Sequence, residues 1–385
     1  MFKVLKQSKK SRARLGLLKT PHGDIETPFF MPIATKGSVK ALTPEDLKNI
    51  GASIILSNTY HLYLQPGLDV LKKFGGLHKF MGWNGPILTD SGGYQVFSLS
   101  NKVYPERSEG LRGPYSSLVK INKAGVEFRS FLDGSKHLFT PESVQQIQDA
   151  IGSDIKMVLD VCSPHPCAKK QAEIDLKLTH DWAKRALEYH RRTQNTISKD
   201  QKNKNLLFGI IQGSTYKDLR LNSAKFLSGL DFDGLAIGGL AVGEDNKTMY
   251  QVLDYTIPEL PVNKPRYLMG VGKPENIIEA IKRGVDMFDC VIPTREARHG
   301  RLYTFKNNKL LGNFYNVINI LNSKYKKDTK PLDKSCTCEL CQNYSAGYLH
   351  HLFKAGEPLA LRLATLHNLA FYVKLINQTK NKELV

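Results

Sequence analysis

LLFGIIQGSTYKDLRLNSAKFLSGLDFDGLAIGG, residues 206–239, contains a complete strand–helix–strand pattern. It begins with an apolar run at 206–211, continues with a helical pattern over Lys217–Leu227, and ends with a second apolar run at 234–238. This order is typical of a parallel βα unit. The same alternation recurs along most of the chain, which therefore indicates an α/β protein.

Eight short apolar runs of this kind lie within about 260 residues. They fall near residues 29–33, 54–56, 86–89, 155–159, 206–211, 234–238, 267–269 and 287–292. Helical patterns separate most of them, and proline stands at the first helical position in TPE at 140–142 and in KPE at 273–275. Eight repeats match a (β/α)8 TIM barrel better than a doubly wound sheet.

Six of these runs end on a polar residue or a glycine. The six residues are Asp90, Asp160, Gln212, Gly239, Gly270 and Asp289. Because the parallel strands of a barrel bring their C-terminal ends to one rim, residues that are distant in the sequence meet there. The pattern therefore predicts an active site at this rim.

Two segments depart from the alternation. Residues 101–117, NKVYPERSEGLRGPYSS, are rich in Pro, Gly, Ser and charge, which is typical of a surface loop. After Pro293, a basic stretch leads to a cysteine cluster and then to an apolar helix that reaches about residue 375. We expect a barrel domain over 1–293 and a small subdomain over 294–385.

The chain is strongly basic, with 55 Lys and Arg against 36 Asp and Glu, a net charge of +19 and a pI near 9.5. A basic proteome would spread this excess evenly. Residues 295–334, however, contain ten Lys or Arg and three acidic residues, a local excess of +7. A patch of this kind favours a polyanionic partner, most commonly nucleic acid.

The sequence favours the cytoplasm and no membrane. No stretch approaches the roughly 20 apolar residues of a membrane span. The basic start of the chain lacks the apolar core of a secretory signal, and residues 14–33 are predicted to form a strand, a turn at 21–23 and a second strand. Six cysteines in 385 residues do not indicate a disulfide framework.

Three cysteines close together predict a metal site. They are Cys336, Cys338 and Cys341, and the helical pattern LALRLATLHNLAFY, which contains His367, follows after them. Three thiolates and one imidazole form a closed tetrahedral set that suits Zn²⁺ in a structural role. His350 and His351 lie nearer to the cysteines in the sequence, and the residues alone leave this choice open.

The strand ends offer groups that suit a purine and its sugar. DSGGYQVF at 90–97 combines a carboxylate, a hydroxyl, two glycines and the ring of Tyr94, which can stack on a base. Asp160 can accept from the two donors on the guanine edge, whereas Gln212 and the backbone at Gly238–Gly239 can donate to its O6. Asp289 remains without a binding role, and a second carboxylate beside a sugar–base bond indicates displacement at the anomeric carbon.

Seven features together carry a family resemblance. They are SNTYHLYLQPG (57–67), DSGGYQVFSLS (90–100), FGIIQGS (208–214), GGLAVGE (238–244), YLMGVGKPE (267–275), MFDCVIPTREARHG (287–300) and the Cys3His set. In this order they resemble the bacterial tRNA-guanine transglycosylases over nearly the whole chain. The resemblance implies a TIM barrel with a zinc subdomain and a homodimer. It also implies exchange of the wobble guanine in the anticodon loop of G-U-N tRNAs for a 7-deazaguanine, towards queuosine.

The resemblance also implies residue roles. Asp289 would attack ribose C1′ and hold the tRNA covalently, Asp90 would be the general acid/base, and His367 would be the fourth zinc ligand, with no nucleotide cofactor. Asp160, Gln212 and Gly239 would recognise the purine edge between Tyr94 and Met269. Further base-binding candidates are Ser91, Cys162, Gly238, Leu240 and Gly270. The candidates for contacting the anticodon loop are Thr294, Arg295, Arg298, His299 and Arg301.

Three features differ from the family pattern. Val161 stands where the family usually has an acid, about 16 residues around 102–117 look inserted, and Cys167 has no family role. Cys162 and Val242 match the enzymes that take 7-aminomethyl-7-deazaguanine, so we expect that base, with queuine as the alternative. A non-catalytic tRNA-binding subunit would lack the two aspartates, and a zinc deaminase would need an open zinc position.

Overall fold

The computed structural model describes residues 2–95, 119–196, 204–307, 310 and 312–380. At its centre, eight parallel strands pair in the order β4-β14-β13-β12-β11-β10-β6-β5. Backbone hydrogen bonds around Ile33 and Leu56 join β4 to β5 and close the sheet into a barrel. The strands are β4 (Phe29–Met31), β5 (Ile55–Ser57), β6 (Ile87–Thr89), β10 (Ile155–Met157), β11 (Leu206–Ile211), β12 (Gly234–Ile237), β13 (Arg266–Leu268) and β14 (Met287–Asp289). The predicted α/β barrel and all eight runs are confirmed.

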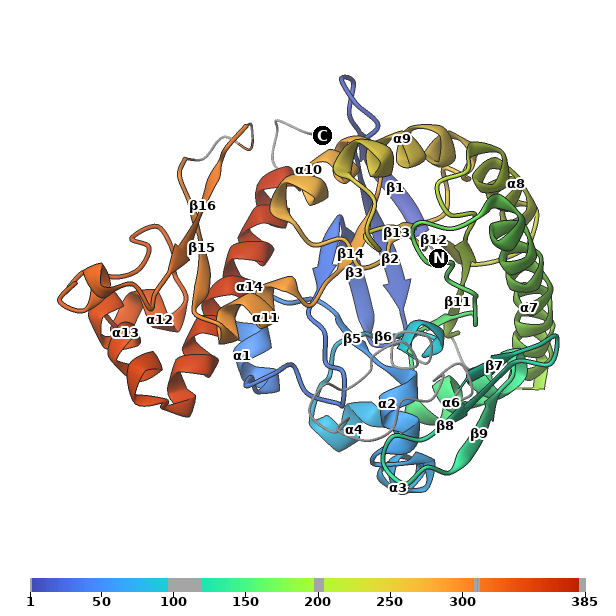
Figure 1. Cartoon of the computed structure of the whole chain (residues 1–385), viewed down its shortest axis with the longest axis horizontal. Helices are drawn as coiled ribbons and strands as arrows, with labels where there is room; N and C mark the ends of the chain where they lie inside the picture. Colours follow the sequence, from blue (N-terminus) through green and yellow to red (C-terminus); the bar gives the residue numbers. More distant parts are fainter. Residues whose placement is uncertain (1, 96–118, 197–203, 308–309, 311, 381–385) are drawn as a thin grey trace.

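Helices surround the barrel (Figure 1). They are α1 (Pro44–Asn49), α2 (Thr59–Leu64), α3 (Leu68–Phe74), α4 (Leu77–Met81), α6 (Pro141–Ile151), α7 (Lys169–Thr196), α8 (Lys217–Ser228), α9 (Asn246–Thr256), the short η3 (Ile257–Glu259), α10 (Pro274–Lys282) and α11 (Ile292–Arg298). α6 starts as predicted: Pro141 is its first residue, and Thr140 and Ser143 cap each other's backbone N–H groups.

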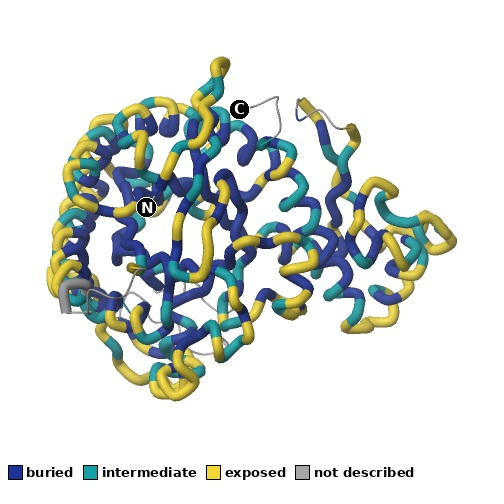
Figure 2. Tube along the Cα trace, turned by 180° about the vertical axis from the view of Figure 1, so that it is seen from behind, coloured by how far each residue is buried: buried dark blue, intermediate teal, exposed yellow. Residues whose placement is uncertain are grey.

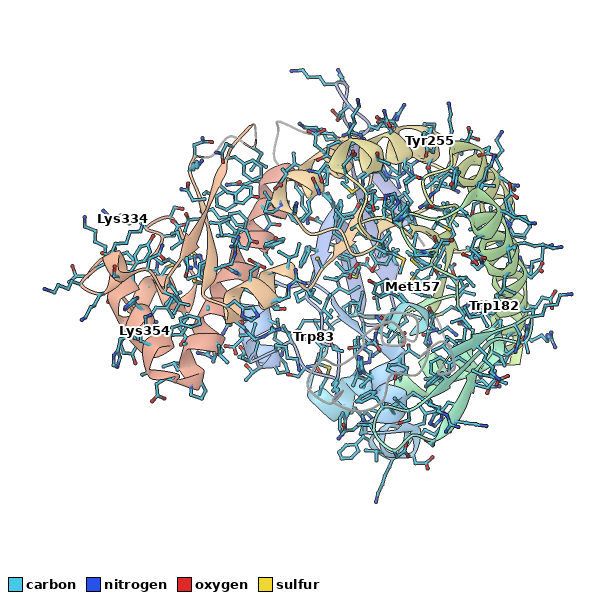
Figure 3. The ribbon with its side chains drawn as sticks, in the orientation of Figure 1. Trp83, Met157, Trp182, Tyr255, Lys334 and Lys354 are labelled. Carbon is cyan, nitrogen blue, oxygen red and sulfur yellow. The ribbon has the colours of Figure 1, made fainter. Side chains whose placement is uncertain are left out.

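The core lies inside the barrel and between the barrel and its helices. Figure 2 shows a largely buried interior surrounded by a periphery where exposed residues are frequent. All six residues of β11 are buried, as are Met157 at the centre of the barrel (Figure 3) and Phe288. Strands covered on both faces are mostly apolar, which is why they appear in the sequence as apolar runs and not as an alternating pattern.

A three-stranded antiparallel sheet packs against the barrel at the N-terminal ends of its strands. It comprises β1 (Phe2–Gln7), β2 (Arg14–Thr20) and β3 (Gly23–Thr27), and it confirms the predicted strand–turn–strand. Arg14 forms a buried ion pair of 2.6 Å with Asp286, which precedes β14 and also accepts from the backbone N–H of Arg266. This pair fixes the sheet to the end of the barrel away from the predicted active site.

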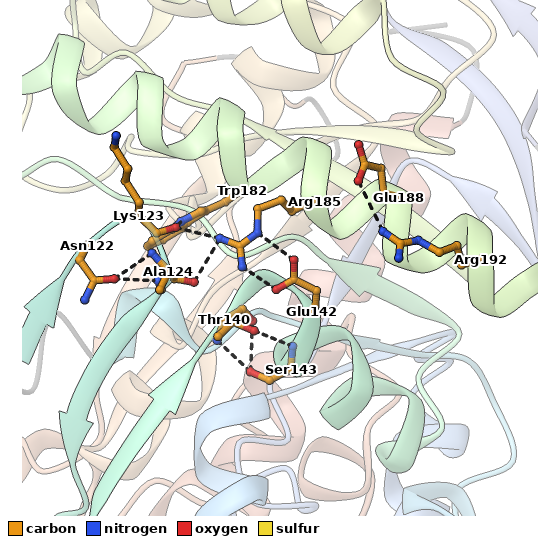
Figure 4. A network of polar contacts seen from close by, with 11 residues as sticks. Asn122, Lys123, Ala124, Thr140, Glu142, Ser143, Trp182, Arg185, Glu188 and Arg192 are labelled. Carbon is orange, nitrogen blue, oxygen red and sulfur yellow. Dashed lines mark hydrogen bonds and ion pairs between the residues drawn. The ribbon is translucent and has the colours of Figure 1, made fainter.

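A second antiparallel sheet was not predicted. It consists of β7 (Val119–Ile121), β8 (Val126–Arg129) and β9 (Lys136–Phe139). Arg185 of α7 holds one end of it: its guanidinium pairs with Glu142 at 2.6 Å and donates to the carbonyls of Lys123 and Ala124 (Figure 4). The predicted insertion at 101–117 lies outside the described residues.

The C-terminal segment projects to one side of the barrel (Figure 1). It contains a hairpin of β15 (Arg301–Phe305) and β16 (Tyr315–Asn319), the short η4 (Ser323–Tyr325), α12 (Glu339–Asn343), α13 (Ala346–Ala355) and α14 (Pro358–Lys380). α14 contacts β4, α10 and α11 of the barrel and also β15, α12 and α13. The division after residue 293 stays a prediction, because α14 belongs to both packing units.

α14 is longer and more apolar than we expected from the sequence. Within the described residues it passes, by length and composition, as a helix able to cross a membrane, but 67% of the apolar window is buried inside the protein. Its apolar surface is therefore explained by packing. For example, the ring of Tyr372 lies 4.9 Å from that of Phe30 in β4.

Candidate active site

A pocket of about 670 Å³ opens at the C-terminal ends of the barrel strands. All twelve predicted catalytic and base-binding residues line it. They are Asp90, Ser91, Tyr94, Asp160, Cys162, Gln212, Gly238, Gly239, Leu240, Met269, Gly270 and Asp289. Tyr94 is 53% exposed, whereas Asp160 and Gln212 are buried at the bottom of the pocket. A flat ligand can therefore enter beside Tyr94 and meet polar groups on its edge.

Asp90 follows β6 and is held by donors on both oxygens. Oδ2 accepts from Asn58 Nδ2 at 2.6 Å and from Gln95 Nε2 at 3.1 Å, while Oδ1 accepts from the backbone N–H groups of Thr59 and Gly92, both at 3.1 Å. Burial raises the pKa of Asp90 to about 7, and the nearby charge of Asp289 adds to the increase. At neutral pH this carboxyl group can both give and take a proton.

Asp289 is the last residue of β14. Oδ1 accepts from the hydroxyl of Tyr267 at 2.6 Å and from the backbone N–H of Gly270 at 2.8 Å. Both hydrogen bonds fall on one oxygen, so Oδ2 has no hydrogen-bond donor among the described residues. Burial raises the pKa of Asp289, and the hydrogen bonds from Tyr267 and Gly270 partly offset that increase.

Asp160 lies three residues after β10 and is 8% exposed. Its Oδ2 accepts from Gln212 Nε2 at 2.7 Å. Burial raises its pKa to about 6, although hydrogen bonds from Gln212 and Ser91 favour the ionised form. The buried Oε1 of Gln212 has no partner among the described residues. A ligand whose edge carries N–H donors would satisfy these acceptors.

Two glycines after β12, Gly238 and Gly239, leave room for the side chain of Gln212 in the pocket. A Cβ at Gly239, whose φ is +66°, would lie 2.4 Å from Gln212 Oε1, and one at Gly238 would lie 2.7 Å from Gln212 Nε2. The buried guanidinium of Arg220 donates to the carbonyl groups of Gly238 and Ile211 at 2.8 and 3.0 Å. Arg220 therefore holds the ends of β11 and β12 in register beside the pocket.

The C-terminal segment contains a buried group that could hold a metal ion. Its members are Cys336, Cys338, Cys341 and His367, whose donor atoms all lie within 4.8 Å of one another. His367 Nδ1 is 3.3 Å from the Sγ of Cys341, and Nε2 lies 2.8 Å from the carbonyl of Tyr303. The proton on Nε2 therefore faces the carbonyl, so the lone pair of Nδ1 points into the thiol cluster. His350 is not a member of this group, and its Nδ1 instead faces the carbonyl of Ile320.

Comparison with known proteins places this geometry in a family. The family model for queuine tRNA-ribosyltransferase matches residues 8–382. The queuine tRNA-ribosyltransferase of Thermoanaerobacter sp. (strain X514) is 51% identical over 98% of this chain and 92% of its own length. Those of Desulforudis audaxviator (strain MP104C) and Macrococcus caseolyticus (strain JCSC5402) are 50% and 48% identical, over 99% and 98% of the chain and 93% and 91% of their own lengths.

The chain belongs to the queuine tRNA-ribosyltransferase family. This confirms the predicted family and the predicted enzyme class, a tRNA-guanine transglycosylase. The reading as a zinc deaminase is thereby excluded.

The predicted RNA-contacting residues of this queuine tRNA-ribosyltransferase family member lie on and after α11. Arg295 is exposed and lines the pocket, and His299 and Arg301 are exposed as well. Arg301 forms an ion pair with Glu296, so part of its charge is offset. Thr294 differs from expectation: it is 4% exposed and donates to the carbonyl of Val291, because its position on α11 faces inward.

Several residues that shape the pocket of this family member were not predicted from the sequence. They are Asn58, Thr59, Gln95, Arg220 and Tyr267. Asn58 directly follows β5, so the rule that identified the other strand ends could have found it. Arg220 lies on a helix and acts through its long side chain, for which the sequence contains no comparable signal.

Proposed function

We propose that this enzyme exchanges the wobble guanine of tRNAs with G-U-N anticodons for a 7-deazaguanine by two successive displacements at ribose C1′. One observation carries the proposal: two aspartates at the ends of different barrel strands, Asp90 after β6 and Asp289 in β14, reach the same pocket with unequal hydrogen bonding. A sugar–base bond placed between them meets a proton donor on one side and a nucleophile on the other. The base must leave the anticodon stack to reach them, at a cost of a few kcal/mol.

In the first displacement, Asp289 Oδ2 forms a bond to C1′ while the bond from C1′ to guanine N9 breaks. Asp90 supplies the proton that the departing guanine needs. In the second displacement, Asp90 accepts the N9 proton of the incoming base, whose N9 attacks C1′ and releases the carboxylate of Asp289. Two inversions retain the configuration at C1′. These roles are supported by the hydrogen bonds: Asp90 accepts on both oxygens, whereas Oδ2 of Asp289 has no donor in the part of the chain that the structure describes.

The purine edge is assigned to Asp160, Gln212 and the backbone of Gly239. As a carboxylate, Asp160 accepts from N1–H and from the exocyclic amine of guanine, two donors that adenine does not present together. Gln212 Nε2, which bonds Asp160 in this structure, can turn to donate to O6. Tyr94 and Met269 line the same pocket, and we assign them to the two faces of the base.

We assign 7-aminomethyl-7-deazaguanine as the incoming base. Val161, the position at which the chain differs from the family pattern, is 3% exposed and does not line the pocket. Cys162, Val242 and the carboxylate of Glu244 do line it. A small ammonium is favoured near Glu244, whose oxygens accept from the backbone N–H groups of Ala241 and Val242. Queuine remains the alternative base.

The metal is proposed to be Zn²⁺ in a structural role. Three thiols and a correctly oriented imidazole match its preferred donors, and four protein ligands leave no position for water. The metal would link α12 to α14 and β15, which carry or orient the ligands. We also propose a homodimer, as the family resemblance implies, and light scattering at several protein concentrations tests it. The cytoplasm and a division after residue 293 remain proposals from the sequence pattern.

The function is tested by exchange of labelled guanine into tRNA without ATP. We expect label to enter a tRNA with a GUN anticodon and not one with an AUN anticodon. Unlabelled 7-aminomethyl-7-deazaguanine should compete more strongly than queuine. If tRNA binds without any exchange, the chain is instead a non-catalytic binding subunit.

The pH dependence of adduct formation follows from the raised pKa of Asp90. Its acid form protonates the departing guanine, so the single-turnover rate is expected to fall as pH rises through about 7. On the acid side the rate falls below about 6, where Asp160 becomes protonated and loses its acceptor role. Direct tRNA binding over the same range is the control, and a rate that rises through pH 7 would contradict the role of Asp90.

A further inference from the structure

An exposed aromatic side chain, Phe131, contacts a residue that lines the pocket. Phe131, in the turn between β8 and β9, is 46% exposed. Its ring centroid is 6.0 Å from that of His61 and 6.1 Å from that of Tyr60, which belong to α2. His61 itself lines the pocket. Phe131 therefore extends the wall of the pocket outward onto the surface.

Positive charge lies directly beside this ring. Lys36 Nζ is 5.8 Å from the centroid of Phe131, and the preceding residue, Thr35, lines the pocket. Burial lowers the pKa of His61 to about 4, and the charges of Lys36 and Lys40 contribute to this decrease. Two exposed lysines thus lie close to a neutral imidazole and an exposed ring. Cations interleaved with aromatic rings are the composition of sites that bind single-stranded nucleic acid.

The turn that presents Phe131 has an ordered hydrogen-bond framework. Ser130 N–H donates to the carbonyl of Ser135 at 2.8 Å, Gly134 N–H donates to the carbonyl of Ser130 at 2.9 Å, and Arg129 donates to the carbonyl of Gly134 at 2.9 Å. At the other end of the same sheet, Arg185 fixes the turn between β7 and β8 to α6 and α7 (Figure 4). A ring that is held in place before binding loses little entropy when a ligand stacks on it.

We propose that Phe131 and Lys36 form a stacking site for a base of the anticodon loop next to the exchanged guanine. The ring of Phe131 carries the base, and the ammonium of Lys36 binds the adjoining phosphate. This inference rests on the proposed function and assigns a second RNA contact, on the side of the pocket formed by α2 and the β8–β9 turn. The candidates on α11 and the site at Phe131 would then contact nucleotides on either side of the flipped base.

Steady-state kinetics of guanine exchange into an anticodon stem–loop RNA test the site. Base–aromatic stacking of the usual strength corresponds to a change of about 5- to 100-fold, so Phe131→Ala should raise the KM for RNA by that factor. The KM for guanine should change by less than about twofold. A purely structural defect would instead alter both constants or kcat. Phe131→Tyr, which keeps the ring, should restore the KM for RNA.

Leu132→Ala is the matched control, because Leu132 is the next residue in the turn, is 50% exposed and has no aromatic ring on which a base could stack. It should leave the KM for RNA unchanged. Lys36→Ala should reduce the slope of log Kd against log salt by about 0.7, the value for one phosphate contact on a single strand. A KM for RNA that is the same in Phe131→Ala and the wild type overturns the proposal.

A spectroscopic measurement separates this proposal from the proposed function. Stem–loop RNAs carry 2-aminopurine immediately 5′ or 3′ of the guanine, and their emission should be quenched by the wild type at one position and not by Phe131→Ala. This readout needs binding only. If the wild type binds and quenches without exchanging guanine, the proposed function fails and the stacking site stands. If it exchanges guanine without quenching at either position, the stacking site fails alone.

Discussion

Asp289→Asn is expected to abolish base exchange and the denaturant-resistant tRNA adduct. The amide has the shape of the carboxylate and can still accept from Tyr267 and the backbone N–H of Gly270, but it cannot form the bond to C1′. Removing the nucleophile of a covalent enzyme lowers kcat by on the order of 10⁴- to 10⁶-fold. Denaturing gel electrophoresis of enzyme mixed with labelled tRNA shows the adduct directly.

The fold should tolerate this substitution. Burial raises the pKa of Asp289 in the folded protein, so its proton is held more tightly there than in the unfolded chain. Such a group favours the fold at low pH and loses that contribution as pH rises through the folded pKa. At pH 8 the neutral amide is therefore expected to leave the Tm unchanged or higher. Asp69→Asn, an exposed aspartate on α3, serves as the control. An adduct that survives in Asp289→Asn would exclude Asp289 as the nucleophile.

Cys338→Ala is expected to lose the metal and to destabilise the fold by on the order of several kcal/mol. Cys338 is 6% exposed, and its Sγ lies 3.6 Å from Nδ1 of His367. With one thiol missing, three donors no longer close the coordination shell, and the metal-dependent link between α12 and α14 is lost. Atomic absorption measures the metal, and denaturant unfolding measures the free energy.

Cys167→Ser is the matched control for this experiment. Cys167 is half-buried, its Sγ contacts the carbonyl of Ala168, and it lies beside α7, away from the metal group. It should keep full metal content and an unchanged free energy of unfolding. A Cys338→Ala protein that retains one equivalent of metal would refute the site. The identity of the bound metal in the wild type tests Zn²⁺ itself.

The barrel was predictable because its strands are buried on both faces. Most of the runs, such as LLFGII at 206–211, are predominantly apolar, so their positions could be read directly. The sheet of β7, β8 and β9 was missed for the opposite reason. Its strands alternate buried and exposed positions, as in VEFR at 126–129, and polar residues interrupt every run. The hairpin of β15 and β16 escaped prediction in the same way, since β16 has no fully buried residue.

The site residues that could be predicted are those that lie at the C-terminal end of a barrel strand. Asp90, Asp160 and Asp289 could be named because each carboxylate follows an apolar run, and charge at such a position is costly without a purpose. The hydrogen bonds that distinguish them could not be predicted. Tyr267 reaches Asp289 from inside β13, and Asn58 reaches Asp90 from the neighbouring strand. These contacts depend on the closed barrel and not on local sequence.

Because α14 follows all the barrel strands in the sequence, its position matters for folding during translation. A chain leaves the ribosome from its N-terminus, and all eight barrel strands are translated before residues 358–380 emerge. Until then β4 lacks the helix that packs against it, and the thiols lack His367. A chain that stops before residue 358 would therefore contain every pocket residue but would lack both the helix that covers β4 and the fourth donor of the metal group.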